Sequence, residues 1–135
     1  MIKLSPYIHF NGNCREAMEF YRKCLGGNLV LSTFADSPMA AQTPPAMKDK
    51  IIHSRLETDS IVIVADDMTR PGVVTVGNNI SLYVQGAGLK EIEVYFSKLA
   101  EGGKVTQPLT EAFFGVFGII NDKFGISWIF QTDRP

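Results

Sequence analysis

Three side chains suited to acid–base or ionic chemistry alternate along one short stretch of the chain: His53, Arg55 and Glu57. Alternate residues of a strand face the same side of a sheet, so we expect all three on one face. His53 could act there as a general base, because histidine titrates near neutral pH. Arg55 could pair with Glu57 or bind a carboxylate or phosphate of a ligand, and the pairing is the simpler interpretation. Roughly 13 Å of strand separates His53 from Glu57, too far for both to bind one metal ion.

A second polar face is predicted in the later part of the chain, where polar residues alternate with apolar ones along two expected strands. This face and a nearby aromatic pair provide further candidate ligand contacts: Asn79, Ser81, Tyr83, Ser127, Ile129, Phe113 and Phe114. The aromatic rings among them could stack on the planar part of a ligand. The sequence contains no glycine-rich phosphate loop, Cys-x-x-Cys pair, Gly-x-Ser-x-Gly turn or His-Glu-x-x-His helix, so no cofactor is predicted.

Other titratable residues favour a structural interpretation. Pro6 is expected to face away from the helix. His9 is an odd number of residues further along the same strand, so we expect it to face the helix side. Asp66 and Asp67 adjoin at a strand end, where paired carboxylates could bind a cation. The start of an exposed loop is the simpler expectation for these two aspartates.

The two cysteines, Cys14 and Cys24, are expected to be free thiols on one predicted helix. They would lie roughly 15 Å apart along its axis, beyond the reach of a disulfide. Free thiols suit a reducing compartment. Cys14, in the first turn, could have a lowered pKa and a raised reactivity, although a small residue near a helix end is the simpler interpretation.

The elements that position these residues follow a repeated pattern. Phe20-Tyr21 and Tyr95-Phe96 occupy the same place in two similar stretches, and each pair leads to a Gly-Gly sequence. Each stretch indicates a strand, a helix and then three strands, so we predict an α+β fold of two βαβββ modules. We expect a single domain over 1–135, with module one at about 1–66, a linking loop at about 67–78 and module two at about 79–135.

Local signals set the expected boundaries. The first helix should begin after Asn13, which has the capping-box spacing to Glu16, and end at Gly26-Gly27. The second helix should cover 89–101. The expected strands are 4–10, 29–34, 51–58, 61–65, 79–84, 104–109, 114–121 and 126–131. Three prolines within 36–50 predict a loop that could cap a pocket.

Composition excludes several classes of function. The formal net charge is −1, with 45% hydrophobic and 20% charged residues, and there is no basic block that would favour nucleic acid or an anionic membrane. We find no apolar span of membrane-crossing length and no signal-peptide pattern at the start. A cytoplasmic protein is the expectation.

The chain resembles the vicinal oxygen chelate superfamily of glyoxalases, bleomycin-resistance proteins and dioxygenases, and most closely its PhnB-like branch. The resemblance covers nearly the whole sequence and is carried by 6–14, Phe20-Tyr21, 50–53, 99–105, Phe114-Gly115 and 122–128. The Asp-Lys-Phe-Gly-Ile-Ser-Trp stretch at 122–128 is its most specific part. The resemblance implies that the two modules form a cupped mixed sheet around a ligand cavity, usually in a homodimer.

The resemblance also implies where a divalent metal would lie in the superfamily's enzymes. The four ligand positions fall on Pro6, His53, Asn79 and Ile129. Only His53 is a good ligand, and a catalytic ion normally needs about three protein donors. No metal is therefore predicted.

Three functions remain open. The leading hypothesis is a metal-independent protein that binds a small organic ligand, since binding needs only shape and a few polar groups. The alternative is a small lyase or isomerase acting on an oxygenated substrate, with His53 as acid or base. Some PhnB-like chains are labelled as methyltransferases, but no cofactor-binding glycine motif supports that label here. Thirdly, the protein could act chiefly through its dimer surface, because the apolar edge strand near Ile2–Phe10 predicts a homodimer.

Overall fold

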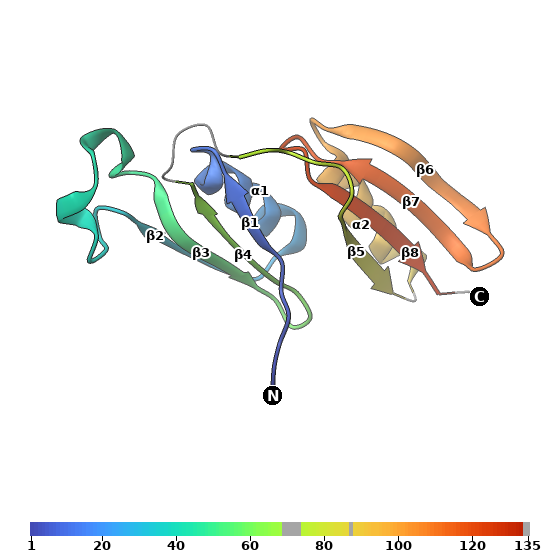
Figure 1. Cartoon of the computed structure of the whole chain (residues 1–135). Coiled ribbons are helices and arrows are strands. Elements are labelled where there is room, and N and C mark those ends of the chain that lie inside the picture. The colour runs from blue at the N-terminus through green and yellow to red at the C-terminus, as the bar shows by residue number, and fades with distance from the viewer. Residues whose placement is uncertain (69–73, 87, 134–135) are drawn as a thin grey trace. The chain divides into compact units, whose positions relative to one another are not determined.

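The computed structural model describes residues 1–68, 74–86 and 88–133. The chain divides into two compact units, Met1–Thr75 (unit 1) and Val76–Pro135 (unit 2). Each unit has a four-stranded mixed sheet with a helix on one face, and the elements run strand, helix, strand, strand, strand (Figure 1). The repeated α+β module is thereby confirmed. The division falls within the predicted linking loop at 67–78, of which 69–73 lies outside the described residues.

Unit 1 is built from β1 (Tyr7–Phe10), α1 (Cys14–Leu25), β2 (Asn28–Thr33), β3 (Ile51–Glu57) and β4 (Val62–Asp67). The strand order is β1-β4-β3-β2. The β1–β4 pair is parallel and the other pairs are antiparallel. The proline-rich stretch before β3 contains two short 3₁₀ turns, Ala40–Gln42 and Pro45–Met47.

The first helix packs against β2, β3 and β4 through the apolar stripe that its sequence predicts. The stripe is buried along its length: Ala17, Phe20, Tyr21, Cys24 and Leu25. After α1 the chain turns through Gly26 and Gly27, with φ angles of 78° and 97°. Gly27 is needed for space as well, because a Cβ there would lie 2.5 Å from the carbonyl oxygen of Glu57.

The start of α1 is held differently from the predicted capping box of Asn13 and Glu16. The Asn13 side chain makes no capping hydrogen bond. Instead, Oδ1 of Asp67 accepts hydrogen bonds from the backbone N–H groups of Gly12 and Cys14, at 2.9 Å each. A carboxylate at a helix N-terminus both satisfies free N–H groups and complements the helix dipole. A side chain distant in sequence has therefore taken the place of the local cap.

β1 is shorter than the expected strand at 4–10, and β3 departs from a regular alternation of faces. β1 begins at Tyr7, and Pro6 precedes it, accepting a hydrogen bond from the backbone N–H of Val64. In β3, the pairing with β2 shifts by one residue next to His53, so Ile51 is fully buried while His53 is exposed. Ile51 therefore does not share a face with His53, because an irregularity in the ladder reverses the alternation.

Unit 2 is built from β5 (Ser81–Gly86), α2 (Leu89–Ala100), β6 (Lys104–Ala112), β7 (Gly115–Asn121) and β8 (Ser127–Thr132). Its strand order is β5-β8-β7-β6, with β5 parallel to β8. The two sheets thus have the same arrangement of strands. β5 begins at Ser81, so Asn79 precedes the strand in which it was expected.

The Asp-Lys-Phe-Gly stretch forms the turn between β7 and β8. Asp122 is buried, and its Oδ1 accepts hydrogen bonds from the backbone N–H groups of Phe124 and Ile126, at 2.9 and 3.0 Å. Its Oδ2 accepts a hydrogen bond of 2.9 Å from Nε1 of Trp128, which is buried. The spacing in this motif therefore serves the fold, because one carboxylate fastens the turn to the core.

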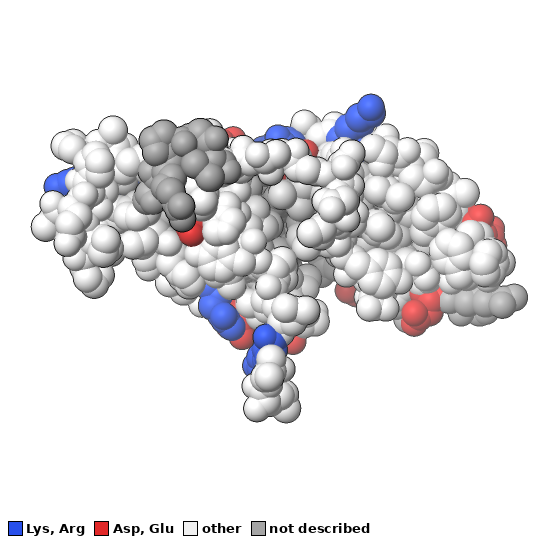
Figure 2. Space-filling model, in the orientation of Figure 1, with Lys and Arg blue, Asp and Glu red and all other residues white. Residues whose placement is uncertain are grey.

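Both helices have 12 residues, and none in the described part of the chain is long and apolar enough to span a membrane. In the view of Figure 2, Lys and Arg side chains are scattered in small groups and do not gather into one basic patch.

Candidate functional site

The face of the unit 1 sheet opposite α1, here called the open face, carries the most developed polar network among the predicted polar surfaces. On β1, Phe10 is buried on the helix side, whereas Tyr7 and His9 are exposed on the open face. The prediction that His9 faces the helix is therefore wrong. The strand starts after Pro6, and the apolar residues Ile8 and Phe10 supply its helix-facing side.

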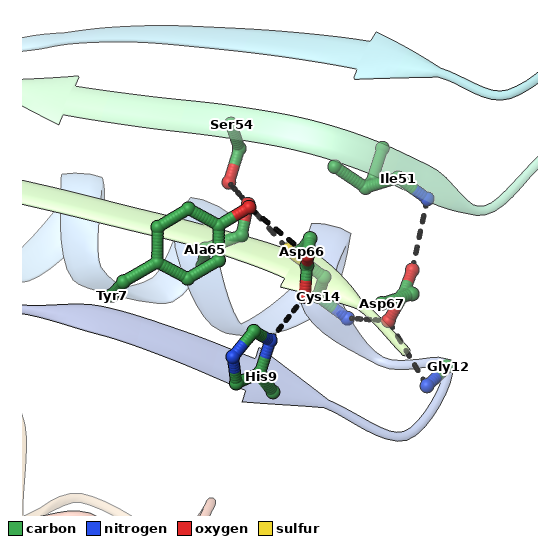
Figure 3. A network of polar contacts seen from close by, with 9 residues as sticks. All are labelled: Tyr7, His9, Gly12, Cys14, Ile51, Ser54, Ala65, Asp66 and Asp67. Carbon is green, nitrogen blue, oxygen red and sulfur yellow. Dashed lines mark hydrogen bonds and ion pairs between the residues drawn. The ribbon is translucent and has the colours of Figure 1, made fainter. Parts of the chain in front are cut away.

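Asp66 of β4 is the centre of this network. Its neighbour across the parallel pair is His9, whose Nδ1 lies 2.8 Å from Oδ1 of Asp66. The hydroxyl of Tyr7 donates a hydrogen bond of 2.9 Å to Oδ2 of the same carboxylate. The rings of Tyr7 and His9 lie 5.1 Å apart, so the two donors form a small aromatic surface over Asp66 (Figure 3). We call Tyr7, His9 and Asp66 the Asp66 network.

The adjacent Asp67 points to the other face of β4. Its side chain is buried, with Oδ1 bonded to Gly12 and Cys14 and Oδ2 accepting a hydrogen bond of 2.9 Å from the backbone N–H of Ile51 (Figure 3). Asp66 and Asp67 therefore do not form a paired-carboxylate cation site. They do not begin an exposed loop either, because both lie within β4, where successive side chains alternate between faces.

Tyr7 remains a neutral hydrogen-bond donor in this arrangement. Partial burial, the hydrogen bond to Asp66 and the charge of that carboxylate together raise the pKa of Tyr7 to about 12. The phenol therefore keeps its proton at neutral pH and holds Oδ2 of Asp66 in place. The network thus consists of the Asp66 carboxylate with hydrogen bonds to the imidazole of His9 and the phenol of Tyr7.

The three sequence-predicted residues of β3 lie on the same open face. The ring of His53 lies 6.3 Å from that of Tyr7 in an edge-on arrangement. Arg55 and Glu57 form the expected ion pair, with 3.1 Å between Nε and Oε1. Their side chains are 45% and 53% exposed, so this pair contributes little to stability. The roles of these residues in ligand binding stay predictions.

The candidate residues of unit 2 fall into two groups. Ser81 and Ser127 share a hydrogen bond of 2.7 Å across β5 and β8, and Tyr83 pairs with Ile129 on the same side of the sheet. Asn79 is exposed just before β5.

The other group is the hairpin between β6 and β7. Phe113 is 82% exposed there, and Phe114 lies between the rings of Phe113 and Phe117, at 5.0 and 5.4 Å. The hairpin thus displays an aromatic cluster.

Cys14 is not an activated thiol. It is fully buried, and its pKa is raised to about 12, mainly by burial and in smaller part by the nearby charges of Asp67 and Asp66. A hydrogen-bond contact of 3.5 Å with Oγ of Ser54 acts in the opposite direction but does not reverse the change. The lowered pKa considered from its place in the first helical turn is wrong, because desolvation outweighs the helix dipole.

The metal implied by the resemblance does not fit the residues present. Across the described residues, no group of three His, Cys, Asp or Glu side chains is arranged to hold an ion. Pro6 and Ile129 have no side-chain donor, and Asn79 is a neutral one. Asp66 is the carboxylate on the open face beside β1. Both of its oxygens are already engaged in hydrogen bonds, one with Tyr7 and one with His9.

A shallow groove of about 680 Å³ lies on a different part of unit 1, between α1 and β2. Its lining shares no residue with the Asp66 network: Glu19, Arg22, Lys23, Gly27, Asn28, Leu29 and Leu31. The sequence predicted no function for these residues.

Sequence reasoning missed Tyr7, His9 and Asp66 as a group. The alternation of Tyr7 and His9 with the apolar Ile8 and Phe10 was a usable signal for their common face. Their proximity to Asp66 had no local signal, because it depends on the parallel pairing of β1 with β4, 57 residues away in the case of His9.

Comparison with known proteins places this geometry in a family. The family model described as 3-demethylubiquinone-9 3-methyltransferase matches residues 2–131. A crystal structure of protein PA1353 from Pseudomonas aeruginosa is 36% identical, with a TM-score of 0.87 and 100% of each chain covered. A putative 3-demethylubiquinone-9 3-methyltransferase, PhnB protein, from Bacillus cereus is 27% identical, with a TM-score of 0.78 and coverage of 97% of this chain and 99% of that one.

The fold extends to more distant proteins. A glyoxalase/bleomycin resistance protein/dioxygenase family enzyme from Burkholderia phytofirmans PsJN is 13% identical, with a TM-score of 0.62 and coverage of 95% of this chain and 97% of that one. At this identity the likeness shows a common fold and nothing more. Since the family model spans nearly the whole sequence, the chain belongs to the PhnB-like (3-demethylubiquinone-9 3-methyltransferase-like) family, with the fold of the glyoxalase and bleomycin-resistance proteins.

Proposed function

We propose that the protein binds a small organic molecule on the open face of its unit 1 sheet, and that it does so without a divalent metal. The observation that carries this proposal is the Asp66 network. It supplies polar groups in fixed positions beside an aromatic surface, which is the combination that orients a small ligand. The four positions implied for the family metal support the absence of a metal, since only His53 among them is a good ligand and the described residues contain no group of three His, Cys, Asp or Glu side chains arranged to hold an ion.

Two exposed tyrosines are suited to contact the ligand. Tyr7 is 46% exposed in unit 1 and Tyr83 is 49% exposed in unit 2. A tyrosine offers a large flat surface at a small entropy cost, so exposed tyrosines favour stacking on a planar molecule. We propose that Tyr7 contacts a ligand on the open face of unit 1, and that Tyr83 and the other unit 2 candidates predicted from the sequence offer contacts within their own unit.

Equilibrium titration against a panel of aromatic and glycopeptide compounds tests this function. We expect one class of compound to bind, and Tyr7→Ala to weaken its binding by roughly tenfold or more, in line with the loss of an aromatic contact and of a donor to Asp66. Asp59→Asn, in the exposed turn between β3 and β4, is the control and should bind normally. A panel in which nothing binds would contradict the proposal, as would one tightly held metal ion per chain in elemental analysis.

An acid–base enzyme is the second candidate, because His53 lies beside Tyr7 on the open face. In that case a small oxygenated substrate would be turned over as by a lyase or isomerase, and His53→Ala would abolish turnover. The name of the matching family model makes methyl transfer a further activity to assay, with the panel compounds and a sulfonium methyl donor. Turnover that survives in His53→Ala would exclude His53 as the acid or base.

We further propose that the protein is a cytoplasmic homodimer. Ile2 and Leu4, in the segment before β1, are each 98% exposed, and β1 is an edge strand of its sheet. Apolar side chains beside an unpaired strand edge favour association with a second copy. Light scattering should give twice the chain mass, and the double variant Ile2→Ser, Leu4→Ser should shift it to the mass of a single chain. A wild-type protein that is monomeric at all concentrations would contradict the dimer.

A further inference from the structure

The imidazole of His9 is fixed by a carboxylate on one side and exposed on the other. Its Nδ1 lies 2.8 Å from Oδ1 of Asp66, while its side chain is 50% exposed. The second ring nitrogen, Nε2, points away from Asp66 (Figure 3). A histidine held in this way has one nitrogen engaged in the fold and one available to a ligand.

The chemistry of the partner determines which nitrogen carries the proton. An aspartate carboxylate can only accept hydrogen bonds, so Nδ1 must be the donor in the contact between His9 and Asp66. In neutral His9 the outward Nε2 is consequently a lone-pair acceptor. Oδ2 of Asp66 is held by the Tyr7 hydroxyl at the same time, so the carboxylate cannot rotate without losing a bond.

We propose that Nε2 of His9 takes the proton of an acidic hydroxyl group, so that the protein binds a phenol or an enol in preference to the corresponding ether. This names the ligand class of the open-face site and therefore rests on the proposed function. In the step, the ligand O–H bond breaks and its electron pair stays on the oxygen. A new N–H bond forms at Nε2, and Asp66 balances the charge of the resulting imidazolium.

The neighbouring groups are less suited to accept this proton. The Tyr7 hydroxyl is engaged as a donor to Asp66, and its raised pKa keeps it protonated. Within the described residues, no carboxylate lies at ion-pair distance from His53, so an imidazolium there would lack the compensation that Asp66 gives to His9. The ring of Tyr7, at 5.1 Å from that of His9 and 6.3 Å from that of His53, provides a surface beside which an aromatic ligand can lie.

Binding of 4-nitrophenol, compared with its methyl ether 4-nitroanisole, tests the inference, because ionisation of the phenol shifts its absorption band to longer wavelength. Binding is measured at a pH close to the pKa of free 4-nitrophenol, where much of the free probe is neutral and an ordinary histidine is mostly unprotonated. We expect the phenolate band to appear on binding to the wild-type protein. We also expect the phenol to bind roughly tenfold or more tightly than the ether, because hydrogen bonds between charged groups are the strong ones.

Two substitutions separate the proton acceptor from its surroundings. His9→Asn keeps a polar group at the position but removes the base, and should abolish both the phenolate band and the preference for the phenol. Asp66→Asn keeps the shape but removes the charge, and should weaken the band. Asp59→Asn is the matched aspartate control and should leave both unchanged.

The outcomes distinguish the inference from the function on which it rests. If the ether binds as well as the phenol, or if the band persists in His9→Asn, the inference is wrong and the binding function stands. If neither these probes nor any compound of the wider panel binds, the proposed function and the inference both fail. A further readout needs no ligand: nitrogen chemical shifts of the free protein should show the proton of neutral His9 on Nδ1, and a proton on Nε2 instead would overturn the inference.

Discussion

Asp67 and Asp66 are adjacent in β4, yet the structure predicts very different effects when each is replaced by asparagine. Asp67 is buried and accepts three backbone hydrogen bonds of 2.9 Å, from Gly12, Cys14 and Ile51. Asparagine has a single acceptor oxygen, so in its best orientation it keeps the two bonds that Oδ1 makes. Its amide group then faces the N–H of Ile51, which is left unpaired in a fully buried residue.

The magnitude follows from these losses. An unpaired buried N–H group costs about 1–3 kcal/mol, and the two remaining bonds lose the strength that a charged acceptor gives them, about 1 kcal/mol together. We therefore expect Asp67→Asn to lower the free energy of unfolding by about 3 kcal/mol. For a chain of this size, that corresponds to a decrease in Tm of roughly 10 °C. Asp66→Asn should cost about 1 kcal/mol or less, because its partners lie on the exposed face, where water can replace the lost bonds.

Urea unfolding followed by far-ultraviolet circular dichroism and by tryptophan fluorescence measures both variants. Trp128 is the single tryptophan and lies in unit 2, so its fluorescence follows unit 2, whereas circular dichroism follows both units. Asp67→Asn should shift the circular dichroism transition to lower urea concentration, while Asp66→Asn stays close to the wild type. Equal midpoints for the two variants would refute the assignment of opposite faces to these two aspartates.

Three further predictions follow from individual contacts. In urea titrations, Gly27→Ala should lower the free energy of unfolding by about 2–4 kcal/mol, and Gly26→Ala by about 1 kcal/mol. Both glycines have a positive φ, but only Gly27 lies against the backbone of Glu57. Arg55→Ala should change stability by about 0.5 kcal/mol or less, since its pair with Glu57 is exposed; a larger change would show that Arg55 has another role in the fold. Cys14 should resist thiol reagents at pH 8 until the protein unfolds, because its pKa is raised to about 12. Because the pKa of Cys14 is about 9 in the unfolded chain and about 12 in the folded one, the unfolded chain loses the thiol proton first as the pH rises. The free energy of unfolding should therefore fall between about pH 9 and pH 12. A flat profile in alkaline urea titrations would argue against a buried thiol.

The order of the elements could be predicted because each module carries its own local signals. The stripe of α1 has helical spacing and ends at Gly26-Gly27, and both glycines have the positive φ that this exit requires. The pairing of Arg55 with Glu57 was equally accessible, since two residues of one strand separated by a single position share a face. These predictions succeed because the interacting groups lie close together in the sequence.

The errors concern contacts between residues far apart in the sequence. Asn13 and Glu16 have the spacing of a capping box, but Asp67, 53 residues beyond Cys14, occupies the position of the cap. The prediction for β1 assigned Pro6 to the face away from the helix, whereas Phe10, which has the same parity as Pro6, is buried on the helix side. This single difference accounts for the wrong orientation of His9.

The end of β4 shows how stability and binding chemistry are connected in this unit. Asp67 fixes the backbone of Gly12 and Cys14, in the turn that follows His9 within a few residues. Asp66, on the other face of the same strand end, holds the imidazole of His9. β1 is a short strand at the edge of the sheet, where it pairs with β4. The buried carboxylate of Asp67 therefore helps to restrain the end of β1, the strand that carries His9. A contact in the core thus supports the strand that carries His9, although Asp67 itself lies on the opposite face from the proposed proton acceptor.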